Sequence, residues 1–270
     1  MNILSEKNIK NEAIINKEEL NRLLDEDNSK IYEVIRVINR KAVFLKEHFQ
    51  RMKESIQLSG TRGSIDFNSY KKSIELLISE NLFENCNIRV SYYYNGGEIA
   101  LFYFIESYYP SKQQFKTGVH TVTAVVQRHN PNVKSFQKAF KEKVQQIMDA
   151  SKAFEAILVN EDGTVSEGSR SNIFFVKGNK LVTSPDSAVL LGVTRNKVAE
   201  VCESNGIEVE KRIIKIDELE SFDGAFITGT SNDVLPIKSI DKIVYNSADN
   251  DTVKKASELY LNEVRKETEI

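Results

Sequence analysis

Two short turns combine glycine with hydroxyl side chains, a pattern that can bind an anion. Gly192-Val193-Thr194-Arg195 leads into an expected helix over 194–205, whose first backbone N–H groups have no partner within the helix. A second turn, Thr228-Gly229-Thr230-Ser231, directly follows an expected strand over 224–228. Its N–H and O–H groups could donate hydrogen bonds to the same anion, for example a phosphate, as the first turn. The alternative is that Thr194 only caps its helix and that the second turn only ends its strand.

Three ionisable side chains could complete such a site. Glu167 lies in a turn where glycine and small residues let the backbone approach a ligand, and its carboxylate could hold a protonated ring nitrogen. Lys134 begins the helix after a linker, where a catalytic lysine would lie at a domain interface. Arg51, beside an apolar stripe, could form a bidentate contact with a phosphate. The alternatives are a solvent-facing glutamate, an ordinary surface lysine and an arginine that extends along the surface.

The remaining composition argues against several classes of protein. The 270 residues carry 37 Lys and Arg against 39 Asp and Glu, and this net charge of −2 excludes a strongly basic nucleic-acid binder. No P-loop, GxGxxG or GxSxG motif occurs, and the three histidines and two cysteines lack the spacing of metal ligands. No apolar run approaches the ~20 residues of a membrane helix, and the polar start has no secretion signal, so we expect a cytoplasmic protein.

The elements that must position these residues alternate between helices and strands. Asn16 and Glu19 form a possible capping box for a short helix that opens the chain, and Asp66 can cap a later helix. Asn95-Gly96-Gly97 separates two aromatic runs and predicts a hairpin. The expected elements of the first half are a helix after Asn16, a strand over 31–37, a helix over 46–58, a helix after Asp66, hairpin strands over 87–94 and 98–107, and a strand over 119–128.

The second half repeats this mixture of helices and strands after the linker 129–132. The pattern predicts an α+β or α/β protein with a smaller N-terminal domain over 1–118, a strand and linker over 119–131, and a larger C-terminal domain over 132–270. The expected elements are a helix that contains Phe136, Phe140, Val144 and Ile147, a strand over 156–159, hairpin strands over 173–176 and 181–183, a helix over 194–205, strands over 207–213, 224–228 and 237–244, and a C-terminal helix around 256–264.

Taken together, these segments resemble the class IV aminotransferases. This is the fold-type-IV family of pyridoxal-phosphate (PLP) enzymes, which includes branched-chain and D-amino acid aminotransferases and aminodeoxychorismate lyase. The resemblance runs in order from residue 31 to residue 245, and the second half is the more specific part. The segments that carry it are 43–52 (VFLKEHFQRM), 132–135 (NVKS), 155–174, 191–195 (LGVTR), 226–230 (FITGT) and 234–237 (VLPI).

The resemblance implies a D-amino acid aminotransferase-like fold whose larger C-terminal domain binds PLP. It also implies a homodimer that acts on amino acids and 2-oxo acids. Lys134 would form the Schiff base and move the proton, and burial or a neighbouring charge can lower the pKa of such a lysine. Glu167 would pair with the pyridine nitrogen, because an apposed carboxylate favours the protonated form. The implied phosphate ligands are Arg51, Val193, Thr194 and Thr230.

The sequence also departs from this family in three places. The polar segment 24–30 stands where most members have a strand, a turn and a Gly-rich segment, so we expect the first strands to be missing. Val34 stands where the lyases carry a threonine, and Tyr94-Asn95-Gly96 stands where D-amino acid enzymes and many lyases carry Thr/Ser-Arg-Gly, so both changes argue against these two subfamilies. The leading hypothesis is an aminotransferase. The alternatives are aminodeoxychorismate lyase and a non-catalytic binding protein of the same fold.

Overall fold

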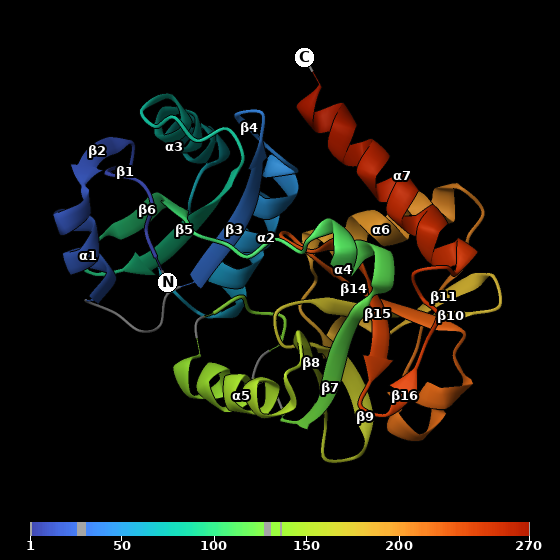
Figure 1. Ribbon diagram of the computed structural model, residues 1–270. Helices are drawn as coiled ribbons and strands as arrows, with labels where there is room; N and C mark the ends of the chain where they lie inside the picture. Colours follow the sequence, from blue (N-terminus) through green and yellow to red (C-terminus); the bar gives the residue numbers. More distant parts are fainter. Residues whose placement is uncertain (1, 26–30, 127–130, 136, 270) are drawn as a thin grey trace. The chain divides into compact units, whose positions relative to one another are not determined.

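The computed structural model describes residues 2–25, 31–126, 131–135 and 137–269, which form two compact units (Figure 1). The first unit holds residues 1–108, 133–137 and 264–270, and the second holds residues 109–132 and 138–263. The domain boundaries predicted at residues 118 and 132 remain predictions. Part of the predicted linker, 129–130, lies outside the described residues. No helix in the described part of the chain is long and apolar enough to cross a membrane.

The first unit is built on an antiparallel sheet with the strand order β2-β1-β6-β5-β3-β4. Three helices accompany it, and α2 packs on β3. The elements are β1 (Lys7–Lys10), β2 (Ala13–Asn16), α1 (Lys17–Asp25), β3 (Ile31–Ile38), β4 (Lys41–Ala42), α2 (Leu45–Leu58), α3 (Phe67–Ser79), β5 (Cys86–Tyr94) and β6 (Glu98–Ile105).

The chain opens with a hairpin. Strands β1 and β2 pair in antiparallel register, and Asn11 and Glu12 between them both have positive φ, as a tight hairpin turn requires. The expectation that the first strands are missing is therefore wrong. The expected helix follows as α1, and Asn16 Oδ1 accepts the Glu19 N–H at 2.9 Å, so the predicted cap is confirmed. Of the polar segment 24–30, residues 26–30 lie outside the described part.

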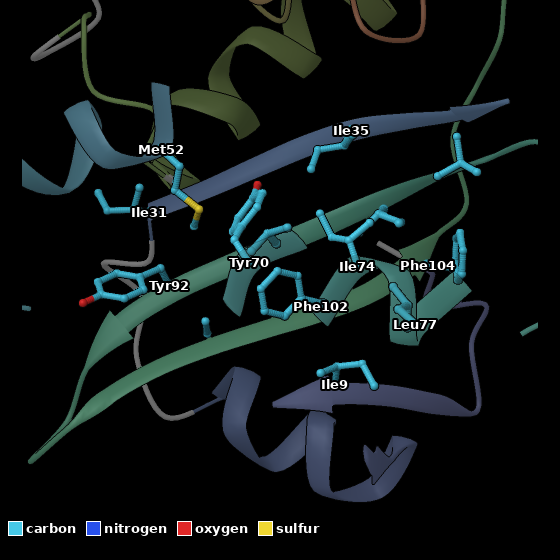
Figure 2. Close-up of a cluster of buried hydrophobic side chains, with 14 of the residues drawn as sticks. Ile9, Ile31, Ile35, Met52, Tyr70, Ile74, Leu77, Tyr92, Phe102 and Phe104 are labelled. Atoms are coloured by element: carbon cyan, nitrogen blue, oxygen red, sulfur yellow. The ribbon is translucent and has the colours of Figure 1, made fainter. Parts of the chain in front are cut away.

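One face of β3 forms the apolar core of the first unit. Side chains alternate along the strand, and every second residue from Ile31 is fully buried. Figure 2 shows Tyr70 of α3 among the side chains of this core, close to Phe102 of β6, with the two rings edge to face at 5.4 Å. Glu33 lies on the same buried face with 0% of its surface exposed. A carboxylate in such a core requires charged or hydrogen-bonding partners.

The two predicted connections of the first unit are confirmed. Asp66 caps α3, because its carboxylate accepts the backbone N–H groups of Asn68 and Ser69 at 2.8 and 3.0 Å. The turn between β5 and β6 is closed by a hydrogen bond from Asn95 N–H to the Gly97 carbonyl. The hairpin therefore forms where the sequence predicts it.

The second unit contains a mixed sheet with the order β12-β11-β10-β14-β15-β7-β8-β9-β13, and β16 pairs with β15. β7 runs parallel to both β8 and β15, so the strand predicted near residue 119 belongs to this sheet. The elements are α4 (Lys112–Thr117), β7 (Val119–Val125), α5 (Lys138–Ser151), β8 (Glu155–Val159), β9 (Thr164–Gly168), β10 (Asn172–Lys177), β11 (Lys180–Thr183), the 3₁₀ turn Asp186–Ala188, α6 (Val193–Ser204), β12 (Val209–Lys211), β13 (Ile214–Lys215), the 3₁₀ turn Ile216–Ser221, β14 (Gly224–Gly229), β15 (Asp233–Ile240), β16 (Ile243–Val244) and α7 (Asp251–Thr268), whose last residues belong to the first unit.

The helix α5 begins later than the sequence predicts. Its first residue is Lys138, so the prediction that Lys134 begins this helix is wrong. Ser135 instead forms an isolated antiparallel bridge with Ile31 at the start of β3. Lys134 is therefore held against the sheet of the first unit, and not by a helix of the second.

Candidate active site

Glu167 is buried at the end of β9, with 2% of its surface exposed. Its Oε2 accepts hydrogen bonds from Asn172 Nδ2 and from the Leu190 N–H, both at 3.0 Å. The solvent-facing alternative for this side chain is therefore wrong. Both of these donors are neutral. A buried carboxylate in such surroundings is stabilised by a cationic partner, and a protonated ring nitrogen is one.

Asn172 connects this acid to the start of α6. Its Nδ2 also donates to the Leu190 carbonyl at 2.8 Å. On the other side of the amide, a Cβ added at Gly192 would lie only 2.1 Å from Asn172 Oδ1. Because the backbone φ of Gly192 is −62°, glycine is needed here for space and not for its conformation. The glycine in the Gly192-Val193-Thr194 turn thus lets the helix approach the residue that holds Glu167.

We expect Gly192→Ala to destabilise the protein by about 1–3 kcal/mol, because the added methyl group forces Asn172 out of place. The measurement is denaturant unfolding of the protein without cofactor. Gly97→Ala is the matched control, because a Cβ there meets no atom within 4 Å. Equal stability of the two variants would contradict the close contact.

The start of α6 and the end of β14 provide groups suited to an anion. Gly192 is the N-cap of α6 and has no side chain, so the alternative that Thr194 only caps the helix is wrong. Both Val193 and Thr194 are buried in its first turn. Thr228 pairs in register with Asn172, and its buried Oγ1 has no hydrogen-bond partner within the described residues. An uncapped helix N-terminus and an orphaned hydroxyl next to Asn172 fit a phosphate group.

Arg195 connects the first turn of α6 to the loop that precedes the helix. The side chain is fully buried, with its Nη1 at 2.8 Å from Asp186 Oδ1 and its Nη2 donating to the Ser184 carbonyl at 2.8 Å. Lys211 pairs with the other oxygen of Asp186 at 3.0 Å. This charged cluster ties the helix start to the preceding loop.

The first unit contains a second buried ionic cluster, around Glu33 of β3. Arg51 Nε lies 2.8 Å from Glu33 Oε1, and Arg51 Nη2 lies 2.6 Å from Oε2. His48 Nδ1 lies 2.8 Å from Oε2. All three side chains are buried, so the surface alternative for Arg51 is wrong. Arg51 is held by one edge of its guanidinium, in the bidentate geometry that fixes the plane of the group.

The charges in this cluster follow from its hydrogen bonds. Burial alone raises the pKa of Glu33, but Arg51 and His48 outweigh it and lower the pKa to about 2. For His48 burial is the largest effect, and it lowers the pKa despite the attraction of Glu33. A neutral His48 must carry its proton on Nδ1 to donate to the carboxylate. The cluster therefore consists of one anion, one cation and one neutral donor at pH 7.

Lys134 is anchored to the same unit through its backbone. Its N–H donates to Ser55 Oγ at 3.3 Å, and its carbonyl accepts the Tyr32 N–H at 3.0 Å. The Lys134 ammonium lies 5.1 Å from the centre of the Tyr32 ring, within cation–π range. Ser55 is one turn after Arg51 on α2, and Tyr32 precedes Glu33 on β3. The same two elements thus hold the lysine and the arginine.

The structure brings the predicted residues into two groups, one in each unit. Lys134 and Arg51 share the first unit, while Glu167 and the turns with Val193, Thr194 and Thr230 share the second. Sequence reasoning missed the residues that hold them. For Glu33 a signal existed, because it falls in phase with the buried apolar residues of β3, where an acid is unusual. The other residues missed are Tyr32, His48, Ser55 and Asn172.

Comparison with known proteins identifies the family of this chain. The family model described as Amino-transferase class IV matches residues 30–240. The D-alanine aminotransferase of Bacillus licheniformis is 32% identical over 226 residues, which cover 78% of each chain. A probable branched-chain-amino-acid aminotransferase of Thermotoga maritima is 31% identical over 218 residues, which cover 78% of this chain and 77% of the relative.

Solved structures show the same fold. The T.th. branched-chain amino acid aminotransferase, solved with pyridoxamine 5'-phosphate, superposes with a TM-score of 0.87 at 22% identity, covering 98% of this chain and 96% of the other. A putative 4-amino-4-deoxychorismate lyase from Legionella pneumophila reaches 0.78 at 20% identity, covering 90% and 93%. The predicted fold-type-IV architecture is confirmed. The chain belongs to the class IV aminotransferases, which depend on pyridoxal phosphate.

Proposed function

We propose that this chain transfers the amino group of an amino acid to a 2-oxo acid with Lys134 as the cofactor-bound lysine and Glu167 as the acid at the ring nitrogen. The observation that carries the proposal is the burial of Glu167, whose Oε2 is held by Asn172 and the Leu190 N–H, beside an uncapped helix start. When bound, PLP supplies an electron sink that its protonated ring nitrogen strengthens. The residues of this chain supply the binding, the orientation and the proton transfers.

Glu167 acts by keeping the ring nitrogen protonated. An opposite charge at hydrogen-bonding distance raises the pKa of such a nitrogen, and burial strengthens the interaction. Asn172 and the Leu190 N–H fix Oε2 and so set the direction in which the carboxylate points. The carboxylate thus holds its proton-sharing geometry before the cofactor enters.

The phosphate is proposed to bind Arg51, Val193, Thr194 and Thr230. At α6 the backbone N–H groups of the first turn and the helix dipole favour an anion. Arg51 is paired with Glu33 through Nε and Nη2, and this bidentate contact fixes the plane of the guanidinium that is proposed to contact the phosphate. A planar group held in this way loses little side-chain entropy on binding.

Lys134 is proposed to hold and move a proton at its Nζ during the reaction. Its backbone is fixed on both sides, by Ser55 and Tyr32, so only the side chain has to swing. The Tyr32 ring lies within cation–π range of the ammonium and favours its position on this side of β3. A positioned base and acid of this kind contributes typically ~10²- to 10⁴-fold to a reaction rate.

Replacing Glu167 by glutamine is expected to lower kcat by about 10- to 10³-fold, since an opposite charge shifts a neighbouring pKa by about 1–3 units. Steady-state kinetics of the PLP-loaded protein measures this. Glu161→Gln, at an exposed position in the turn before β9, is the matched control. A Glu167→Gln variant with the kcat of the parent protein would contradict the role proposed for Glu167 at the ring nitrogen.

A two-substrate screen would identify the amino donor. The relatives include a D-alanine aminotransferase and probable branched-chain-amino-acid aminotransferases, so D-alanine and the L-branched-chain amino acids are the donors to test first, with pyruvate and 2-oxoglutarate as acceptors. Turnover that requires the acceptor supports the proposal. Pyruvate release from aminodeoxychorismate without an acceptor would support the lyase, and bound PLP without any turnover would support a binding protein.

We also propose that the protein is a homodimer and cytoplasmic. Support for both comes from the resemblance to the family of aminotransferases. Light scattering of the purified protein tests the dimer. A single species of 30.7 kDa would contradict it.

A further inference from the structure

The second unit contains another buried glutamate, Glu155, which is bonded to the segment that follows Glu167. Glu155 of β8 has 1% of its surface exposed and accepts four hydrogen bonds. Its Oε1 accepts the Ala156 N–H at 2.9 Å and Ser169 Oγ at 2.6 Å. Its Oε2 accepts Ser171 Oγ at 2.9 Å and the Arg170 N–H at 3.3 Å. Three of the four donors therefore come from one short segment, 169–171.

This segment is the connection between β9 and β10. It begins directly after Glu167 and Gly168 and ends at Asn172. The connection is tightly folded, because a Cβ at Gly168 would lie 2.1 Å from Ser171 Oγ and 3.3 Å from Glu155 Cγ. The Ser169 N–H also donates to the Ala156 carbonyl at 2.9 Å. Glu155 is thus the side chain around which this turn is built.

We propose that Glu155 is a positioning residue for Glu167. It fixes the 168–171 turn, the turn fixes Asn172, and Asn172 Nδ2 holds Glu167 Oε2 at 3.0 Å. This inference rests on the proposed role of Glu167 at the ring nitrogen. Glu155 itself does not touch the cofactor in this account. Its effect passes through the hydrogen bonds of the turn.

The chemistry of the four donors calls for a carboxylate at this position. Two of the donors are backbone N–H groups, of Ala156 and Arg170, and these cannot turn around to accept. Glutamine would offer one oxygen and one NH₂ group, so one backbone N–H would face another donor. The two serine hydroxyls can rotate to accept, but the turn would lose its fixed register. A buried polar group left without a partner is costly, so the turn shifts to relieve it.

The test is the protonation of the ring nitrogen in Glu155→Gln. The probe is PLP labelled with ¹⁵N in the ring, whose NMR signal differs strongly between the protonated and unprotonated forms. We expect the signal of Glu155→Gln to move toward the unprotonated position by at least half of the displacement that Glu167→Gln causes. The control is Asp241→Asn, because Asp241 likewise accepts a backbone N–H and a hydroxyl, both from Thr123 of the same unit. It should leave the signal in place.

The outcomes separate the inference from the proposed function. If Glu167→Gln leaves the ring-nitrogen signal unchanged, the role proposed for Glu167 fails. If Glu167→Gln moves the signal and Glu155→Gln does not, the positioning role of Glu155 is overturned. Should Glu155→Gln not fold, the double variant Ser169→Ala with Ser171→Ala keeps the acid and removes two donors. It should give a smaller displacement in the same direction, and no displacement would overturn the inference.

Discussion

Lys134→Ala should lower kcat by about 10²- to 10⁴-fold through the loss of proton transfer alone, and should remove the covalent link to PLP. The fold should be retained, because the hydrogen bonds of Lys134 with Ser55 and Tyr32 come from backbone groups that alanine keeps. Steady-state kinetics with the donor and acceptor identified for the parent protein gives the first result. The absorption spectrum of the PLP-loaded variant gives the second.

Lys138→Ala is the matched control for this variant. Lys138 is the first residue of α5, its side chain is 76% exposed, and it lies 3.9 Å from Glu142. Such a surface pair contributes little, so kcat should stay within about twofold of the parent value. A Lys134→Ala variant as active as Lys138→Ala would contradict the assignment of the lysine.

Glu33→Gln should lower the free energy of unfolding by about 3–5 kcal/mol, because it leaves the Arg51 guanidinium buried without its anion. Denaturant unfolding at pH 7 measures this change. Glu54→Gln is the control on the exposed side of α2, where the glutamate accepts a hydrogen bond from Gln50, and it should change stability by less than about 0.5 kcal/mol. Equal loss in both variants would contradict the account of the cluster.

The same cluster predicts a dependence of stability on pH. The pKa of Glu33 is about 2 in the folded protein against 4.5 as its ordinary value, so its contribution is fully present above pH 4.5 and is lost as the pH falls toward 2. A difference of this size corresponds to about 3 kcal/mol. The stability gap between the parent protein and Glu33→Gln should therefore narrow between pH 4.5 and pH 2. A gap that stays constant over this range would show that Glu33 is not the titrating group.

The candidate residues of the second unit could be predicted from the sequence because they are close together along the chain. Glu167 and Asn172 lie five residues apart and the Gly192 turn follows, so glycine and hydroxyl residues mark the site locally. Even there, the sequence left open whether Glu167 faces solvent. Burial by Leu190 and Asn172 decides this, and it depends on packing that no local pattern records.

The contacts of Lys134 and Arg51 in the first unit were less accessible to sequence reasoning because they are long-range. The bond between Lys134 and Ser55 joins residues 79 positions apart. The apolar spacing of Phe140, Val144 and neighbouring residues suits a helix, and it led to the wrong start at Lys134. The bridge between Ser135 and Ile31 prevents the helix from beginning there. A tertiary contact thus overrides the local pattern.

The opening hairpin was missed for a different reason. Strands β1 and β2 have only four residues each, and the turn between them contains Asn11 and Glu12 where a glycine would be the usual signal. The partner that stabilises β1 is β6, far away in the sequence. The capping signal of Asn16, in contrast, is local, and it was read correctly.

Borohydride reduction tests whether Lys134 is the residue that binds PLP covalently. The purified protein is loaded with PLP and reduced with borohydride, and its peptides are mapped by mass spectrometry. We expect a pyridoxyl group on the peptide that contains Lys134. A pyridoxyl group on a different lysine, or none on any peptide, would contradict it.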